Sequence, residues 1–521
     1  MISDRSSKMR ISLRRRRATA IGSAALTALL LSSCAVHQHP FTAEENITRA
    51  KANAIATFAN QDPVKGPIDY GEALARAVKY NLQDRIKLSE AAVADQQVDV
   101  ALWDLVQPIT VNNTNRWRNK DNAASSESIL THTQSLEPSI STEKNTENLD
   151  LRMAYNVLDF GVSYLRARQA ANAYLMAEER RQRTIQSIGR DVRTAYWNAV
   201  AAERVIGKLD LLQQKVAQAI AQSKQANTSG AQRPLDALKY QLTLNQTMDR
   251  VVQLRAKFVA AKLDLARLMN LKPGEDYAVT VPGLDTIAPP QMDAKLEDLE
   301  FKALQTRPEL QEAAYQKRIS ADETRKTIVR LLPGIEVGGG FSHDSNRFLT
   351  NHNWVDASVS VTWNIVNMLS GPSKIRESRA EQKVSEISEQ GMTMAVMTEV
   401  YISAKEFEVA QQAYQLALDR SKLQGEIYAQ VQQQGPTEQG GTLEVIRAQL
   451  EAGVADLERD IAYASLQSTY GALLQATGEY PLPKETNGKD LASLAEAFRS
   501  AEATIAARPV VVAASEAASH E

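Results

Sequence analysis

Residues 147–161, with the sequence ENLDLRMAYNVLDFG, join a strand pattern directly to a very long helical pattern. Apolar and polar residues alternate from Leu149 to Val157, which is the period of a half-exposed β-strand. Beyond Gly161 the apolar period becomes helical, and one heptad phase collects most apolar residues on a single stripe. The stripe comprises Ile185, Ile188, Val192, Ala195, Ala199, Ala202, Ile206, Leu209, Val216 and Ile220. A continuous helix over 161–227 would be roughly 100 Å long at about 1.5 Å per residue, far longer than a globular helix.

The same order of elements occurs twice in the chain. The first copy predicts a helix over 69–107, a strand over 109–118, a polar loop over 119–146 and a second strand over 149–157. A long helix over 161–227 and a shorter helix over 234–271 follow. The second copy predicts the same elements over 294–332, 334–342, 346–353, 354–364, 373–434 and 442–477. A shift of 208 residues carries the first heptad stripe onto Val396, Val400, Phe407, Ala410, Tyr414 and Ala417, with Ser403 as the polar exception. The sequence therefore predicts a duplicated structural unit.

The element lengths predict how each unit packs. Two short helices of each copy, placed end to end, match the length of its long helix, so we expect them to stack beside it with the strands at one end. Four strands leave two open edges, which a lipid bilayer does not tolerate, and a closed barrel needs at least eight strands. We therefore expect the chain to oligomerise.

The N-terminus has the pattern of an export signal. Arg10 and the run Arg14–Arg17 precede a mostly apolar segment, 18–31, that is too short to span about 30 Å of hydrocarbon. The segment ends in Leu31-Ser32-Ser33-Cys34, which resembles the lipobox of bacterial lipoproteins and implies an acylated Cys34. The alternative is an unmodified cysteine near an ordinary cleavage site. Ala35 favours the outer membrane, because lipoproteins retained in the inner membrane often carry Asp there.

Composition favours a mainly helical protein with a small β part. Hydrophobic residues make up 43% of the chain and aromatic residues only 6%, and the formal charge of −2 comes without a basic stripe, so nucleic-acid binding has little support. We divide the chain into a signal peptide (1–33), a tether (34–67), a first repeat (68–290), a second repeat (291–483) and a largely disordered C-terminal tail (484–521), with one possible helix over 491–507.

Several segments together resemble the TolC-type outer-membrane efflux proteins, in their lipoprotein branch. They are Pro108 before a strand, Leu158–Gly161 before the long helix, Gly230–Asp236, Leu332–Gly334 and Gly435–Glu444. The resemblance covers about 68–483 and implies a homotrimer, with a 12-stranded transmembrane β-barrel, open to the outside, above an α-helical tunnel across the periplasm. It also implies a periplasmic adaptor protein and an inner-membrane pump as partners, with outer-membrane lipid around the barrel.

The resemblance also indicates where the duct would open. Asp236 and Glu444 are 208 residues apart, just after the two helix turns, where the family narrows its tunnel, and a ring of carboxylates there would select cations. The alternative is that both are first-turn carboxylates favoured by a helix dipole. Gly230 and Gly435 are the candidate tip turns for adaptor docking, and we expect the second turn to be extended by Gln439-Gly440-Gly441.

The sequence contains no catalytic constellation, so we expect no enzyme, no cofactor and no metal. The six histidines lie in the tether, loops and tail without metal-site spacing, and Gly338-Gly339-Gly340 sits in a strand pattern with no phosphate-loop context. Three functions remain. They are an exit duct for small toxic compounds, an exit duct of a type I protein or polysaccharide export system, and a lipid-anchored coiled-coil scaffold without a pore.

Overall fold

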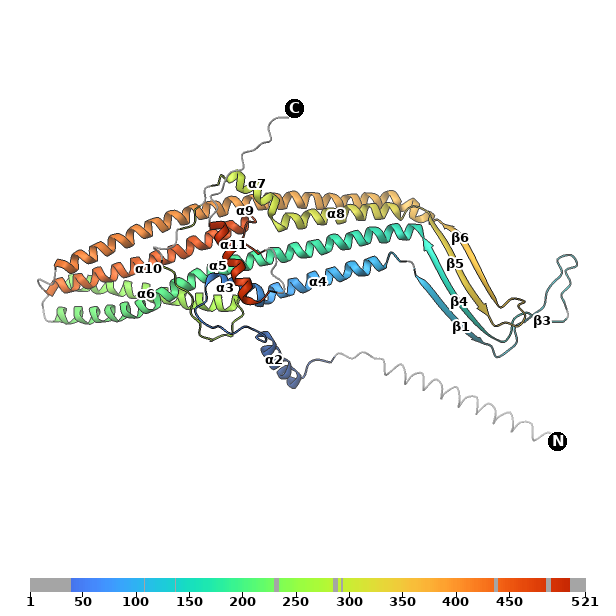
Figure 1. Ribbon diagram of the computed structural model, residues 1–521, viewed down its shortest axis with the longest axis horizontal. Helices are drawn as coiled ribbons and strands as arrows, with labels where there is room; N and C mark the ends of the chain where they lie inside the picture. Colours follow the sequence, from blue (N-terminus) through green and yellow to red (C-terminus); the bar gives the residue numbers. More distant parts are fainter. Residues whose placement is uncertain are drawn as a thin grey trace, which may run out of the picture. The chain divides into compact units, whose positions relative to one another are not determined.

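The computed structural model describes residues 39–506 apart from 107, 136, 229–233, 284–288, 292–293, 435–438 and 484–488 (Figure 1). The chain divides into two units, residues 1–61 and 62–521. In the first unit, helix α2 (Ala43–Thr57) begins at a capping box, in which Thr42 accepts from the Glu45 amide and Glu45 accepts from the Thr42 amide. The second unit begins at Asp62, earlier than the predicted Ile68, because Arg76 donates to the carbonyls of Asp62 and Pro63.

Two very long helices dominate the second unit, α5 (Val157–Thr228) and α9 (Ile365–Gln434). Both begin earlier than predicted, because an asparagine caps each: the Asn156 side chain accepts from the Leu158 amide, and the Asn364 side chain accepts from the Asn367 amide. These two caps are separated by the same 208 residues that relate the heptad stripes. The predicted start of the second long helix at Ser373 is therefore wrong, and Pro372 lies inside α9.

The shorter helices pack along the long ones as the lengths predict. Helices α4 (Leu82–Trp103) and α6 (Pro234–Leu268) both contact α5, and α8 (Pro308–Val329) and α10 (Gln439–Ala476) both contact α9. Figure 1 places α4 and α6 toward opposite ends of α5. The end-to-end arrangement beside a long helix is thus confirmed.

Each leading helix is broken once, which its apolar period does not predict. The expected helix 69–107 consists of α3 (Tyr70–Tyr80) and α4, because Asn81 has an extended backbone and its side chain accepts from the Gln83 amide. The expected helix 294–332 consists of α7 (Leu296–Thr306) and α8, because Pro308 occupies the first turn of α8 and holds Arg307 out of the helical region.

The main sheet has four antiparallel strands in the order β1-β4-β5-β6. Their bounds are Ile109–Trp117, Asn145–Asn156, Gly334–Asp344 and Asn353–Thr362, so all four predicted strands are confirmed. The strands follow α4 and α8 and lead into α5 and α9, which places the sheet at one end of the helices (Figure 1). Two short strands, β2 (Ala123–Ala124) and β3 (Ser139–Ile140), pair with each other inside the β1–β4 connection.

The core follows the predicted heptad stripes. Val192, Ala199 and Ala202 on α5 and Val400 and Phe407 on α9 are completely buried. The polar exception Ser403 is buried as well, and the side chains of Ile206 and Leu209 lie outside the described residues. The duplicated stripes thus belong to one hydrophobic core.

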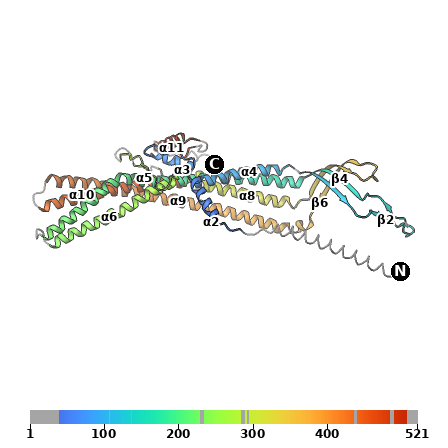
Figure 2. The ribbon, with the colours of Figure 1, turned by 90° about the horizontal axis from the view of Figure 1, so that it is seen from below.

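The C-terminal segment is more ordered than predicted. Helix α11 (Leu491–Ala506) packs against α3, and its residues Leu494 and Phe498 are buried (Figure 2). The possible helix over 491–507 is therefore confirmed, and an apolar face of α11 completes the core around α3.

Candidate functional site: an amphipathic sheet with two open edges

The register of the main sheet gathers apolar side chains on one face, which we call the apolar face. Residues that stand directly opposite each other on neighbouring strands share a face of a sheet. The pairs Val111↔Leu151, Leu151↔Phe341 and Phe341↔Val355 therefore run across all four strands on one side. The same register puts Ile109, Leu149, Met153, Tyr155, Ile335, Val337, Val359 and Val361 on this face.

The opposite face, the polar face, carries hydroxyl, amide and charged side chains. Its members include Thr110, Asn112, Arg116, Asp150, Arg152, Glu336, Ser342, Asp356, Ser358, Ser360 and Thr362. Arg152 on β4 reaches Asp356 on β6 at 3.7 Å, across Gly340 on the strand between them. A Cβ atom at Gly340 would lie 3.0 Å from the Leu151 carbonyl oxygen and 3.7 Å from Arg152 Nε. Glycine at 340 therefore leaves room for this cross-strand ion pair.

Both outer strands of the sheet have a neighbour on one side only within the described chain. They are β1 and β6, and three successive antiparallel pairings make them run in opposite directions. A β6 edge could therefore pair antiparallel with the β1 edge of another copy and continue the sheet. Every residue of β1 is exposed, so the edge is accessible.

The helices also expose apolar residues at heptad spacing, the pattern of a helix–helix contact surface. On α9 the exposed stripe contains Ile387, Met394, Ile402, Val409, Leu416 and Leu423. On α4 and α6 the exposed stripe contains Ile86, Val93, Val100, Leu235, Leu238, Leu242, Val252, Val259 and Leu263. A long stripe on α9 thus faces outward from one repeat, and a stripe of stacked helices faces outward from the other.

The two candidate gate residues occupy different positions in their helices. Asp236 is the third residue of α6, and its side chain lies outside the described residues. Glu444 is exposed and comes five residues after the start of α10 at Gln439. The alternative that both are first-turn carboxylates is therefore wrong for Glu444.

The two candidate tip turns lie outside the residues that the structure describes. Gly230 falls in 229–233, between α5 and α6, and Gly435 falls in 435–438, between α9 and α10, and both segments lie outside the described residues. The expected extension of the second turn is wrong, because Gln439-Gly440-Gly441 belong to α10. Cys34, the predicted lipidation site, also lies outside the described residues.

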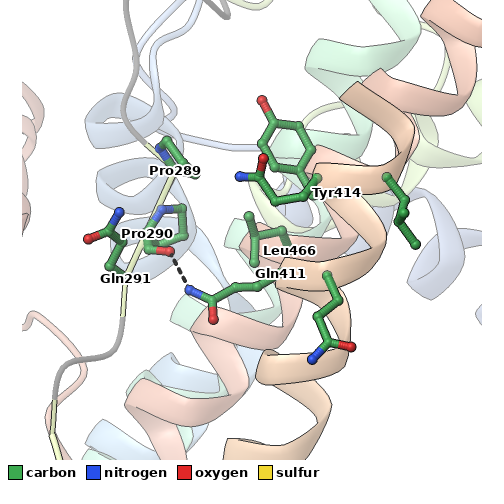
Figure 3. Close-up of a pocket in the computed structure, with 9 residues that line it drawn as sticks. Pro289, Pro290, Gln291, Gln411, Tyr414 and Leu466 are labelled. Atoms are coloured by element: carbon green, nitrogen blue, oxygen red, sulfur yellow. Dashed lines mark hydrogen bonds between the residues drawn. The ribbon is translucent and has the colours of Figure 1, made fainter. Parts of the chain in front are cut away.

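A pocket lies apart from the main sheet. A pocket of about 560 Å³ lies between Pro289–Gln291 and helices α9 and α10, where Gln411 donates to the Pro290 carbonyl oxygen at 3.2 Å (Figure 3). Its lining is proline, glutamine, leucine and one tyrosine, with no carboxylate, histidine or cysteine. The described residues contain no acidic, histidine and cysteine cluster placed to hold a metal ion. Within the same residues, no helix combines the length and the apolar character of a transmembrane span.

Comparison with solved structures identifies the fold. The chain superimposes on the outer-membrane channel OprN with a TM-score of 0.61 and 16% identity, covering 79% of this chain and 90% of that one. The MtrE outer-membrane channel of Neisseria gonorrhoeae superimposes with a TM-score of 0.60 and 16% identity, covering 78% of this chain and 88% of that one. The CmeC outer-membrane channel of Campylobacter jejuni superimposes with a TM-score of 0.61 and 11% identity, covering 89% of this chain and 97% of that one. No family model and no curated protein sequence matches the chain.

Proposed function

We propose that this chain, which has the fold of the TolC-type outer-membrane efflux channels, is the outer-membrane exit duct of a tripartite efflux system. The system would expel small toxic compounds. In this proposal Cys34 carries the lipid anchor and the helices cross the periplasm. A periplasmic adaptor and an inner-membrane pump would dock at the tips around Gly230 and Gly435.

The amphipathic sheet is the observation that carries this proposal. A strand in lipid turns its apolar residues outward, and a water-filled lumen is lined by polar residues, so the two faces of the sheet match a barrel wall. Lipid also requires that every edge be paired. A coiled-coil scaffold without a pore gives no reason for an apolar sheet face beside an ion-paired polar face.

Closure by further copies of the chain accounts for both open edges. Pairing of β6 with the β1 of a neighbour, repeated in three copies, gives 12 antiparallel strands and leaves no edge. The exposed stripes on α9 and on α4 and α6 would then pack between neighbouring copies, because association buries apolar surface. We therefore propose a homotrimer.

A pair of adjacent substitutions tests the barrel. Val359 on the apolar face and Ser360 on the polar face are neighbours on β6. In the proposed barrel Val359→Arg would point a charge into lipid, at a cost of about 2–4 kcal/mol near the midplane, and should abolish trimer insertion. Ser360→Arg should insert, because the new guanidinium would face the lumen opposite Glu336, and should change the single-channel conductance.

Planar-bilayer recording of the purified parent protein is the direct assay. Stepwise conductance would support the proposed duct. Protein that inserts into the bilayer but never conducts would contradict it. Deleting the gene then separates the two kinds of cargo. Increased drug sensitivity supports efflux, whereas unchanged sensitivity with loss of an exported protein or polysaccharide would establish the alternative, a type I or polymer export duct.

A further inference from the structure

A pocket of about 300 Å³ lies where α8 leads into β5 and β6 leads into α9, and we call it the neck pocket. Arg330 and Leu331, just after the end of α8, form one side, and Asn367, Lys374 and Glu377 on α9 form the other. Figure 1 shows this end of both helices beside the sheet. The neck pocket therefore lies at the level where the helices give way to the strands.

Contacts between α8 and α9 hold the walls of the neck pocket in place. The hydroxyl groups of Thr327 and the buried Ser378, which also line the pocket, lie 3.0 Å apart and share a hydrogen bond. Trp363 Nε1 donates to the Leu331 carbonyl oxygen at 3.1 Å. A Cβ atom at Gly371 would lie 2.8 Å from the Leu331 side chain, so glycine at 371 lets Leu331 pack directly against α9. The neck pocket is therefore pre-formed in the single chain.

Two basic side chains of the neck pocket, those of Arg330 and Lys374, form no ion pair with a carboxylate among the described residues. The Lys374 ammonium group donates to the Asn367 side-chain oxygen at 3.1 Å, and Arg330 acts on Glu323 only at longer range. Glu377 is the one carboxylate in the lining of the pocket, so two positive charges face one negative charge. An anionic group bound there would accept charge-assisted hydrogen bonds from both basic side chains.

Helix geometry places Arg330 on the side of α8 opposite an exposed apolar residue. Ile328 is 40% exposed, and a residue two positions further along a helix points about 200° away from it. Arg330 keeps a helical backbone, with φ −63° and ψ −10°. In the proposed barrel the exposed apolar side chains beside the sheet face lipid, so Arg330 and the neck pocket face the lumen.

The first repeat supplies another basic side chain at the same level. The 208-residue shift that relates the helix caps Asn156 and Asn364 also carries Arg166 on α5 onto Lys374 on α9. Arg166 is exposed and, within the described chain, forms no ion pair. Because both residues follow their caps by the same distance, they lie at the same height and point in the same direction. The proposed trimer would therefore surround this level of the lumen with basic side chains from both repeats.

We propose that the neck pocket binds the anionic group of small organic anions that pass through the duct. The passage rests on the proposed function, whereas the binding does not, because the pocket lies within one chain. Arg330 and Lys374 would hold the anionic group, and Leu331 would contact the apolar part of the compound. The volume of about 300 Å³ is at the lower end for small-molecule sites, which favours compounds the size of one aromatic ring. The candidate gate residues Asp236 and Glu444 belong to helices that begin at the opposite ends of α5 and α9, so their charges act elsewhere in the duct.

Saturation-transfer NMR on the full-length protein in detergent tests the binding. Benzoate should bind, and neutral benzamide, which has nearly the same shape, should bind about tenfold more weakly or not at all. Arg330→Gln with Lys374→Gln should weaken benzoate binding about tenfold, because the charged hydrogen bonds are lost. Glu377→Gln should bind benzoate several-fold more tightly, because it removes the repelling carboxylate. The matched control is Arg376→Gln, which removes an exposed charge from α9 outside the pocket and should bind as the parent does.

Three results of the NMR experiment would overturn the inference. They are a folded parent that does not bind benzoate, equal binding by the parent and the double variant, and displacement of benzoate by an equal concentration of inorganic phosphate. The last result would assign the pocket to a free anion instead of an organic one. Thermal unfolding at the temperature of the parent shows that each variant is folded, which we expect because Arg330, Lys374 and Glu377 are exposed.

Single-channel recording tests whether the pocket lies in the path of the cargo. Benzoate should reduce the current of the parent and benzamide should not, and the variant Arg330→Gln with Lys374→Gln should need about tenfold more benzoate for the same block. If the parent conducts and benzoate blocks both proteins equally, the inference is wrong while the duct stands. If neither protein conducts, the proposed function fails, and the NMR result still decides whether the neck pocket binds organic anions.

Discussion

The guanidinium of Arg193, in the middle of α5, pairs with the carboxylate of Glu502 on the C-terminal helix α11, 309 residues away in sequence. Arg193 is buried, its guanidinium lies 4.9 Å from the ring of Tyr70 and 5.3 Å from that of Tyr470, and it donates to Gln467 at 3.0 Å. One side chain thus joins α3, α5, α10 and α11. We expect this cluster to hold the C-terminal helix on the body.

Arg193→Met should destabilise the attachment of α11. Removing one partner of a buried ion pair costs about 3–5 kcal/mol, and the partly exposed Glu502 places the expected loss near the lower end. Limited trypsin digestion at Arg499, inside α11, should become much faster. The matched control is Arg255→Met, whose exposed pair with Asp210 should contribute less than about 1 kcal/mol. Equal cleavage of both variants would contradict this role for Arg193.

The tyrosines around Arg193 should make the protein sensitive to alkali. Burial raises the pKa of Tyr480 to about 12, although Arg193 acts in the opposite direction, and burial also raises the pKa of Tyr70. A pKa raised by folding stabilises the folded state below about pH 10, and this contribution is lost as the pH rises from about 10 to about 12. Circular dichroism with tyrosinate absorbance should show unfolding in this window, and Tyr480→Phe should lose less stability across it.

Two glycines of the long helices should respond to alanine with opposite signs. Gly425 on α9 has nothing within 4 Å of an added Cβ, so Gly425→Ala should stabilise the protein by about 0.5–1 kcal/mol through helix propensity. At Gly189 on α5 an added Cβ would overlap the ring of Tyr480, so Gly189→Ala should destabilise. Thermal unfolding of both variants measures the difference. Stabilisation of Gly189→Ala would show that the contact with Tyr480 is loose.

The gate interpretation of Asp236 and Glu444 predicts a change in conductance. Asp236→Asn with Glu444→Gln should reduce block by cations or raise the single-channel conductance, because a ring of carboxylates attracts cations and repels its own copies. Recording in symmetric KCl with and without divalent cations measures both effects. A double variant that conducts and is blocked as the parent is would leave these residues without a role in the gate.

The lipidation of Cys34 predicts a mass change in the mature protein. Mass spectrometry of the N-terminal peptide should find Cys34 as the first residue with added acyl mass. Cys34→Ser should lose that mass and leave an uncleaved or differently cleaved N-terminus. An unmodified Cys34 in the mature parent would remove the lipoprotein interpretation.

Periodicity was enough to predict the long helices, the four strands and the buried stripes, because each depends on a repeat over many residues. It did not predict the breaks at Asn81 and Arg307, where a single extended residue interrupts a helix whose apolar period continues on both sides. Pro308 and the capping side chain of Asn81 were the available signals. The helix at 491–507 was predicted as possible, but its packing against α3 through the buried Leu494 and Phe498 was not, because periodicity does not identify the partner of an apolar face.

The candidate site was predicted in outline only. Alternation assigns each strand an apolar and a polar side, but it does not determine which residues stand opposite each other. The ion pair of Arg152 with Asp356 joins residues 204 positions apart and depends on the register of three strands. The helix tips follow from the duplication, yet the boundary at Gln439 depends on how far α10 extends.

The open edges of the sheet also determine the order in which the protein can mature. The consecutive helices α5 and α6, and likewise α9 and α10, pack against each other and are local enough to form early in a single chain. A sheet with an apolar face and two unpaired edges can pair with other chains and aggregate. This risk lasts until neighbouring copies pair with its edges and lipid covers its apolar face. If the chain is the proposed duct, we expect newly exported copies to reach the outer membrane with their helices formed and to complete their sheet only on insertion. In that case the yield of assembled duct should depend on the supply of subunits.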